Sequence, residues 1–169
     1  MKAIAAVDRN WGIGYRGELL VSLPEDQKGT FRAYTLGGTV VYGRKTLETF
    51  PGMRLLPGRR NIILSRNLDY RVEGATVMHD IFEVLRYEKS HPKEAIWIIG
   101  GEDVYRQFLP YCEEAVITRI DHTFVADAFL PNLDYSPSWD VFDESDVVHT
   151  DKGYDFTVYR YHNQCVQIL

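Results

Sequence analysis

The chain has 169 residues, of which 45% are apolar, so it is long enough to enclose one full hydrophobic core. Its 24 acidic and 19 basic residues give a net charge of -5. This balance argues against nucleic-acid and membrane-surface partners, because both attract basic faces. Cys112 and Cys165 do not have the spacing of metal ligands or of a redox pair. No apolar stretch has the length of a signal-peptide core or a membrane span. We therefore expect a cytoplasmic monomer with one domain over residues 1–169, no metal and a small-molecule partner.

Short apolar runs alternate with helical patterns along the first two thirds of the chain. The apolar runs predict strands at Ala3–Val7, Thr39–Tyr42, Asn61–Leu64, Ala75–Met78 and Ala95–Ile99. The patterns between them predict helices at Glu25–Thr35, Arg44–Thr49, Ile81–Glu88 and Glu102–Leu109. This order is typical of an α/β domain with a largely parallel sheet covered by helices.

After Pro110 the pattern changes to strands alone. Strand-like segments at Glu114–Asp121, Trp139–Glu144 and Phe156–Tyr161 predict antiparallel strands that close one edge of the sheet. Two connections, Arg9–Leu23 and Pro51–Arg60, are longer than usual, and long loops in a small domain often carry function.

The segment Gly12–Gly17 matches the G-x-G-x-x-G fingerprint of dinucleotide-binding proteins and follows a predicted strand. In that fingerprint the last glycine opens a helix whose N-terminus faces the pyrophosphate. Here no helix can start before Pro24. We therefore interpret these glycines as turn residues of a mobile loop.

Three other predicted strands end in polar or glycine-rich turns, namely Gly43-Arg44-Lys45-Thr46, Ser65-Arg66-Asn67 and Gly100-Gly101-Glu102-Asp103. The carboxyl ends of parallel strands share one edge, where ligands bind. Helix-opening amides and basic side chains attract phosphate there, and the basic character favours NADP over NAD. The alternative is that the basic residues are merely solvated and the glycine pairs merely form tight turns.

Seven segments, taken together, resemble the dihydrofolate reductase family in order and spacing over nearly the whole chain. These segments are Ala6–Gly14, Leu23–Asp26, Val41–Thr46, Leu56–Ser65, Ile98–Tyr105, Thr118–Asp121 and Ala126–Pro131. The resemblance implies a mostly parallel eight-stranded central sheet with an antiparallel C-terminal edge and helices on both faces. It also implies a flexible loop over the active site and a cis peptide bond between Gly100 and Gly101. The activity it implies is NADPH-dependent reduction of 7,8-dihydrofolate to tetrahydrofolate, by hydride transfer to the pterin ring.

The resemblance makes Asp26 the catalytic acid. Without it, Asp26 would be an ordinary acid in the first turn of a helix, where the helix dipole favours it. With it, the carboxylate pairs with the pterin's amino group and ring nitrogen and assists protonation, aided by a pKa that an apolar pocket raises. The pocket residues that the family match implies are Ile4, Ala6, Leu19, Phe31, Phe50, Leu56 and Ile99.

Two further substrate contacts are implied. Thr118 would hydrogen-bond the Asp26 carboxylate and fix its orientation, although a β-branched residue also simply fills a strand. Arg59 would take the α-carboxylate of the glutamate tail, for which a planar guanidinium is suited, while its neighbour Arg60 is solvated. A register error of one residue would exchange these two arginines.

The cofactor set implied by the resemblance covers the three strand ends and the long first loop. Phosphate contacts fall to Gly43, Arg44, Lys45, Thr46, Ser65 and Arg66. Pyrophosphate and neighbouring contacts fall to Gly100, Gly101, Glu102, Asp103, Val104 and Tyr105. The nicotinamide would be flanked by Ala6, Ile13, Gly14 and Leu19, with Ile99 as a further contact. Asp127 resembles a residue of a second loop that supports the closed form.

The sequence departs from the family pattern at two places. Most members have a tryptophan shortly before the catalytic acid, where this chain has Leu20-Val21. The helix after Asp26 carries one extra residue around Gly29-Thr30, after which Phe31 realigns. Two alternatives stay open: a reductase of the same fold that acts on aminopyrimidines, and a non-catalytic pterin- or nucleotide-binding module.

Overall fold

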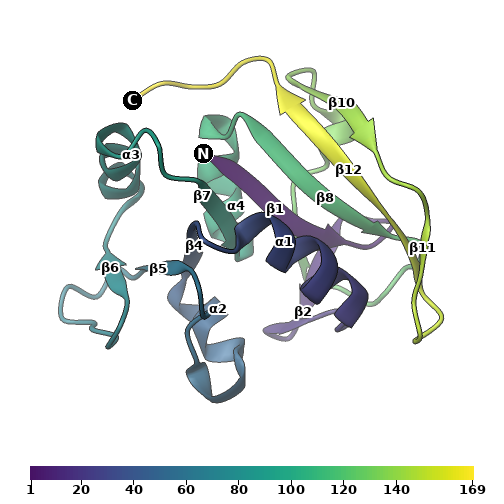
Figure 1. Cartoon of the computed structure of the whole chain (residues 1–169), viewed down its shortest axis with the longest axis horizontal. Coiled ribbons are helices and arrows are strands. Elements are labelled where there is room, and N and C mark those ends of the chain that lie inside the picture. The colour runs from purple at the N-terminus through teal and green to yellow at the C-terminus, as the bar shows by residue number, and fades with distance from the viewer.

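One nine-stranded sheet runs through the computed structural model, which describes residues 1–169 (Figure 1). Its strands are β1 (Lys2–Val7), β4 (Thr39–Gly43), β5 (Arg60–Leu64), β6 (Thr76–Met78), β7 (Ile96–Gly100), β8 (Glu114–Ile120), β10 (Trp139–Glu144), β11 (Val148–His149) and β12 (Asp155–Asn163). The continuous path is β10-β12-β8-β1-β7-β4-β5-β6, and the short strand β11 pairs with β12. Neighbours from β8 to β6 are parallel, whereas β12 is antiparallel to β8 and β10. The predicted α/β class with an antiparallel C-terminal edge is confirmed.

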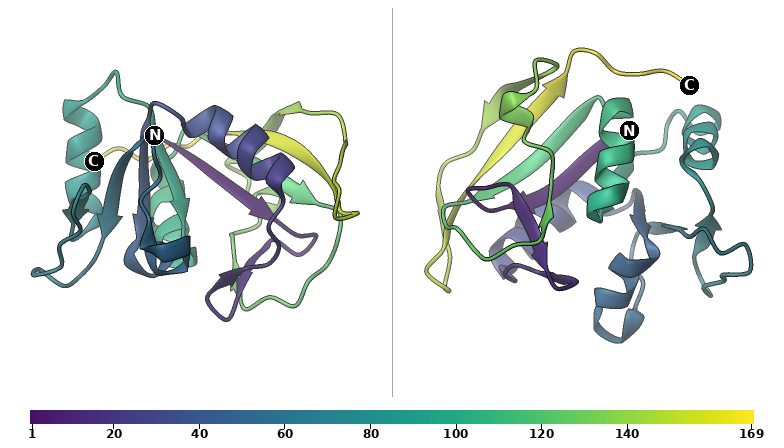
Figure 2. Two further views of the ribbon diagram at one scale, coloured as in Figure 1. Left: turned by 60° about the horizontal axis from the view of Figure 1, so that its bottom comes forward. Right: turned by 180° about the vertical axis from the view of Figure 1, so that it is seen from behind.

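Both faces of the parallel strands are buried. Alternate residues of each strand point to opposite sides of the sheet, so one strand contributes to two apolar clusters. In β4, Val40 and Tyr42 pack in one apolar cluster and Val41 in the other. The first face is covered by the π-helix η1 (Glu25–Phe31), α1 (Arg32–Thr35) and α2 (Arg44–Thr49). The second is covered by α3 (Ile81–Ser90) and α4 (Glu102–Phe108). Figure 2 shows α1 and α4 on opposite sides of the sheet. None of these helices combines the length and the apolar character needed to cross a membrane.

The segment expected to be a loop over Arg9–Leu23 contains two short strands, so this part of the sequence prediction is wrong. Strands β2 (Gly12–Tyr15), β3 (Glu18–Leu19) and β9 (Ala128–Phe129) form a small antiparallel sheet. Two glycines permit close packing: a Cβ at Gly12 would lie 2.7 Å from the Ala126 Cβ, and one at Gly14 would lie 3.0 Å from the Glu18 carbonyl oxygen. Only Gly17, with φ of 79°, serves as a turn glycine. No helix follows it, which confirms that the fingerprint is not a dinucleotide motif.

The helix expected over Glu25–Thr35 is present, but its first seven residues are a π-helix that passes into α1 at Arg32. A π-helix bonds residue i to residue i+5, so one turn contains an additional residue compared with an α-helix. The extra residue noted near Gly29 is therefore absorbed inside the helix. Short 3-10 turns complete the chain: η2 (Pro51–Met53) inside the long second loop, η3 (Leu109–Tyr111) and η4 (Leu133–Tyr135).

Asp8, directly after β1, ties two distant segments together. Its buried carboxylate accepts hydrogen bonds from the backbone N–H groups of Asn10 at 2.9 Å and Gly12 at 2.8 Å through one oxygen. The other oxygen accepts from the N–H of Phe124 at 3.0 Å. Asp8 thus fixes where the small sheet begins relative to β1 and to the segment after β8.

We predict that Asp8→Ala lowers the free energy of unfolding by about 2–3 kcal/mol, because it leaves three backbone donors without their carboxylate partner. Urea denaturation of the purified protein measures this change. Asp69→Ala, at an exposed loop position, is the matched control and should change stability by less than about 0.5 kcal/mol. Equal stability of the two variants would contradict the role given to Asp8.

Candidate active site

The carboxyl ends of three neighbouring parallel strands bring the predicted phosphate-binding turns together. Strand β4 lies between β7 and β5, with Gly43 opposite Leu64 and Tyr42 opposite Gly100. The turns that begin at Gly43, Ser65 and Gly100 therefore share one edge of the sheet, where open α/β sheets bind ligands. The peptide bond between Gly100 and Gly101 is cis.

Asp26 is buried at the start of η1, and Thr118 of β8 donates a hydrogen bond from its hydroxyl to Asp26 Oδ1 at 2.5 Å. The helix begins with Leu23-Pro24, and the N–H of Asp26 bonds to the Leu23 carbonyl at 3.0 Å. Thr118 is also buried, and its strand position lies opposite Ala6 of β1. The contact joins residues 92 positions apart in the chain, so it depends on the sheet register.

Burial raises the pKa of the Asp26 carboxyl above its ordinary value, while the hydrogen bond from Thr118 and the nearby Thr30 hydroxyl lower it in part. Desolvation disfavours the charged carboxylate, and donors that bond to the charged form favour it. The net effect is an acid that holds its proton to higher pH than an exposed aspartate. That property suits a group that assists protonation.

Most of the apolar residues expected around Asp26 lie in one cluster on the same face of the sheet. Ile4 is buried in it, and the half-buried members are Phe31, Phe50, Leu56 and Ile99. Ala6 packs on a neighbouring cluster of Leu23, Ile120 and Phe156. Val21, at the place of the family's tryptophan, packs on that second cluster too. Leu19 departs from the expected set, because it lies on β3 with 66% of its surface exposed and belongs to neither cluster.

Arg59 and Arg60 point to different parts of the molecule. The Arg59 guanidinium bonds the Pro57 carbonyl at 2.9 Å and the Thr35 hydroxyl at 3.2 Å, and lies 5.9 Å from the Phe31 ring centroid. Burial and the nearby Arg32 lower the pKa of Arg59. Arg60 instead pairs with Glu94 at 3.5 Å. The arginine beside Phe31 is therefore Arg59.

The edge of the sheet at the carboxyl ends of β4, β5 and β7 combines basic side chains with the Gly100-Gly101 pair. Arg44, Lys45 and Arg66 supply cations, although Arg44 also pairs with Glu48 at 3.6 Å. Cβ atoms added at Gly100 and Gly101 would lie 3.6 and 3.4 Å from Thr46 Oγ1. These are ordinary van der Waals distances, and glycine is favoured at position 100 by its φ of 139°. This donor set fits a phosphorylated dinucleotide.

The remaining residues of the predicted cofactor set have varied surroundings. The Glu102 carboxylate accepts from the N–H of Phe129 at 2.8 Å and pairs with Arg106 at 3.0 Å, and Asp103 is exposed. Val104 is buried under Gly43. The buried hydroxyl of Tyr105 donates to the Ile4 carbonyl at 2.7 Å, so this side chain anchors β1.

The small antiparallel sheet places two more predicted residues. Ile13 packs against the apolar cluster that α3 and α4 cover, and Gly14 of β2 pairs with Leu19 and with Ala128. Asp127 accepts two hydrogen bonds from the N–H of Arg16, at 3.1 and 3.2 Å. The turn between β2 and β3 is thereby linked to the segment before β9.

Sequence reasoning missed His79. His79 directly follows β6, and its Nδ1 lies 2.8 Å from the Ser65 carbonyl oxygen, so it stands beside the cationic edge. His79 is thus a polar residue at the carboxyl end of a fourth strand. The sequence prediction of ligand-binding turns at strand ends could have included it on that ground.

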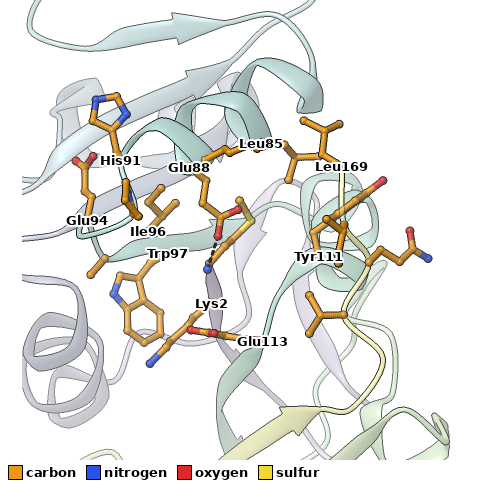
Figure 3. A pocket seen from close by; sticks show the side chains of 17 residues that line it. Lys2, Leu85, Glu88, His91, Glu94, Ile96, Trp97, Tyr111, Glu113 and Leu169 are labelled. Carbon is orange, nitrogen blue, oxygen red and sulfur yellow. Dashed lines mark hydrogen bonds and ion pairs between the residues drawn. The ribbon is translucent and has the colours of Figure 1, made fainter.

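A cavity of about 520 Å³ is remote from this site (Figure 3). It is formed at the amino ends of β1 and β7, beside α3 and the last residues of the chain, and Lys2, Glu88 and Trp97 line it. The terminal ammonium of Met1 pairs there with Glu88 at 2.7 Å. None of the predicted site residues lines this cavity.

Comparison with known proteins agrees with this geometry. The sequence model of the family described as Dihydrofolate reductase matches residues 1–163. The chain belongs to the dihydrofolate reductase family. The dihydrofolate reductase of Neisseria gonorrhoeae is 36% identical over 158 residues, which cover 94% of each chain. That of Mycobacterium tuberculosis H37Rv is 40% identical over 126 residues, 72% of this chain and 74% of the relative.

A solved structure supports the same fold. The dihydrofolate reductase of Enterococcus faecalis, complexed with NADP(H) and RAB-propyl, superposes with a TM-score of 0.84 at 36% identity. The match covers 96% of this chain and 95% of that one. The two places where the sequence departs from the expected pattern, Leu20-Val21 and the segment near Gly29, lie just before η1 and within it.

We predict that Asp26→Asn raises the melting temperature at pH 7 by roughly 2–4 °C, the shift that about 1 kcal/mol produces in a chain of this size. The folded-state pKa of Asp26 lies above its unfolded value, so ionisation costs stability as pH rises through the folded pKa. At pH values below the pKa of Asp26 in the unfolded chain, Asp26 is protonated in both the folded and the unfolded state. The higher melting temperature of the variant should then disappear. Thermal melts from pH 3 to pH 8 test this, and a variant less stable at pH 7 would contradict it.

Proposed function

We propose that this chain catalyses the NADPH-dependent reduction of 7,8-dihydrofolate to 5,6,7,8-tetrahydrofolate, and that Asp26 assists protonation of the pterin. One observation carries the proposal: the buried Asp26 carboxylate is oriented by the Thr118 hydroxyl, and Phe31 of the same helix packs on the apolar cluster of β4, β5 and β7, the strands that end in the predicted phosphate-binding turns. Family membership and the names of the relatives support it.

Asp26 is suited to bind the pterin's 2-amino group and adjacent ring nitrogen. Thr118 bonds one lone pair of Oδ1, and an ionised carboxylate offers about four acceptor sites, so both oxygens keep capacity for two parallel hydrogen bonds. Ile4, Phe31 and Phe50 supply apolar surface around the ring. Because the pKa of Asp26 is raised, the carboxyl favours the protonated substrate near neutral pH.

Arg59 is suited to bind the substrate's glutamate tail. Its guanidinium is held over the Phe31 ring and beside Thr35, so its planar donor face is fixed before a ligand arrives. A second cation, Arg32, lies close enough to lower the pKa of Arg59, and an anionic carboxylate relieves that repulsion.

The cationic strand ends would hold NADPH, with Arg44, Lys45, Ser65 and Arg66 at its phosphates and the Gly100-Gly101 backbone at the pyrophosphate. The enterococcal relative is complexed with NADP(H). When bound, the cofactor supplies the hydride. The protein's residues position both ligands, and the β2–β3 turn, tied to Asp127, would exclude water from the reacting atoms.

The same proposal includes the setting in which the enzyme works. We infer one domain over residues 1–169 acting as a cytoplasmic monomer on a small molecule, without nucleic-acid or membrane partners. The net charge of -5 supports this setting.

We predict that Asp26→Asn lowers kcat/KM for dihydrofolate at pH 7 by at least a hundredfold while the Kd for NADPH changes less than about twofold. Asparagine keeps the size of the side chain and removes the ionisable group. Loss of NADPH absorbance with dihydrofolate present gives the rate, and fluorescence titration gives the Kd. Turnover near that of the wild type would defeat the assignment of Asp26.

Assays with other substrates separate the alternatives. A reductase acting on aminopyrimidines would oxidise NADPH with such a compound and leave dihydrofolate unchanged. A binding module would bind both ligands and consume no NADPH in any assay.

We predict that Arg66→Ala raises the KM for NADPH about tenfold and leaves the KM for NADH nearly unchanged, because only NADPH carries the 2′-phosphate that a guanidinium would bond. Steady-state kinetics with both cofactors measures the ratio. Arg86→Ala, at an exposed position of α3, is the matched control and should alter neither value. Equal kcat/KM of the wild type for both cofactors would contradict the proposed site.

A further inference from the structure

Glu102 is the first residue of α4 and directly follows the Gly100-Gly101 turn, where the pyrophosphate of NADPH is proposed to bind. Its two carboxylate oxygens have different partners. Oε2 accepts a hydrogen bond from the backbone N–H of Phe129 at 2.8 Å, and Oε1 accepts one from Arg106 Nη2 at 3.0 Å. The side chain therefore joins the predicted pyrophosphate-binding turn to β9, across 27 positions of the sequence.

The bond from Glu102 gives β9 a second attachment. Antiparallel pairing joins β9 to β2, and directly after β9 the N–H of Leu130 donates to the Trp11 carbonyl at 2.9 Å. The N–H of Phe129 has the Glu102 carboxylate as its partner instead. Strand β9 is therefore bonded both to β2 and to α4. Because β9 has only two residues, this one added bond is a substantial part of its attachment.

The position of β9 is transmitted to the β2–β3 turn. Asp127, directly before β9, accepts hydrogen bonds from the N–H of Arg16 in that turn at 3.1 and 3.2 Å. Strand β2 pairs with β9 on one side and with β3 on the other. A displacement of β9 would therefore displace the turn, so Glu102 is connected to the β2–β3 turn by a short series of hydrogen bonds.

We propose that Glu102 is a positioning residue, whose carboxylate holds β9, and through β9 the β2–β3 turn, at a fixed place beside the Gly100-Gly101 turn. The proposal rests on the function proposed above, in which the β2–β3 turn excludes water from the reacting atoms. It gives the Glu102 side chain a role different from the direct cofactor contact that the family resemblance implies.

The surroundings of Glu102 indicate that its reach matters more than its charge. A carboxylate that faced the pyrophosphate would repel it. Here the oxygens are engaged by Phe129 and Arg106, and the Arg106 guanidinium offsets the negative charge from the next turn of the same helix. What the bond to β9 requires is an acceptor oxygen at the end of a side chain as long as glutamate.

The test uses three substitutions of Glu102 in the full chain. Glu102→Gln keeps an acceptor oxygen at the same reach and removes the charge, Glu102→Asp keeps the charge on a shorter side chain, and Glu102→Ala removes both. Glu113→Ala, an exposed position before β8 at the opposite end of the sheet, is the control. NMR of the ligand-free protein gives the hydrogen-exchange rate of the Phe129 amide. A single-turnover experiment with saturating NADPH gives the rate of hydride transfer to dihydrofolate.

We expect the Phe129 amide to exchange about tenfold faster in Glu102→Asp and Glu102→Ala than in the wild type, because both lose the bond that protects it. Hydride transfer should slow by about threefold or more in the same two variants, since the β2–β3 turn is held less firmly. Glu102→Gln and Glu113→Ala should stay within about twofold of the wild type in both measurements.

Three results would overturn the role of Glu102. If Glu102→Asp behaves as the wild type, or if all three substitutions have equal effects, the bond to Phe129 is not what matters. If exchange of the Phe129 amide is unchanged in Glu102→Ala, the carboxylate does not hold β9. If exchange is faster but hydride transfer is unchanged, β9 does not position the reacting groups. A wild type that transfers no hydride to dihydrofolate defeats the proposed function, while the exchange rates still decide whether Glu102 holds β9.

Discussion

The site depends on keeping one carboxylate out of water without losing its ability to ionise. Burial of Asp26 disfavours its charge, and the hydrogen bond from Thr118 offsets part of that cost. Asp26 lies on η1 and Thr118 on β8, so the helix must meet the strand in one register. The parallel pairing of β1 with β8, which sets Ala6 opposite Thr118, fixes that register. The hydrogen bond between Thr118 and Asp26 therefore depends on the strand pairing of the sheet as well as on the two residues.

The sheet brings the second half of the site to the same place. Strands β7, β4 and β5 are parallel neighbours, so three turns from distant parts of the sequence end at one edge. Apolar clusters on both faces hold these strands rigidly, and Tyr105 ties α4 to β1 through the Ile4 carbonyl. The small antiparallel sheet is attached to this framework by Asp8 and Glu102, which accept hydrogen bonds from backbone N–H groups of β2 and β9. Within the small sheet, Asp127 links the β2–β3 turn to β9.

The sequence predicted the elements whose signals are local. Continuous apolar runs such as Ile96–Ile99 identified strands that are buried on both faces, and their alternation with helices predicted the α/β class. The small sheet was missed because β3 and β9 have two residues each, and because β2 pairs with β9 across a long sequence separation. The contact between Asp26 and Thr118 has no local signal, so only the family resemblance pointed to it. Leu19 was expected in the pocket from that resemblance alone, and its side chain is exposed on β3.

The π-helix changes how residue numbers transfer between this chain and its relatives. A π-helical turn contains one more residue than an α-helical turn, so an extra residue between Gln27 and Thr30 changes which side chains face the site. The π-helix ends at Phe31, so a single constant offset in residue numbers cannot apply on both sides of an extra residue. Substitutions catalogued in other members along this stretch must therefore be transferred by superposed coordinates, because counting along the chain would assign them to the wrong side chain.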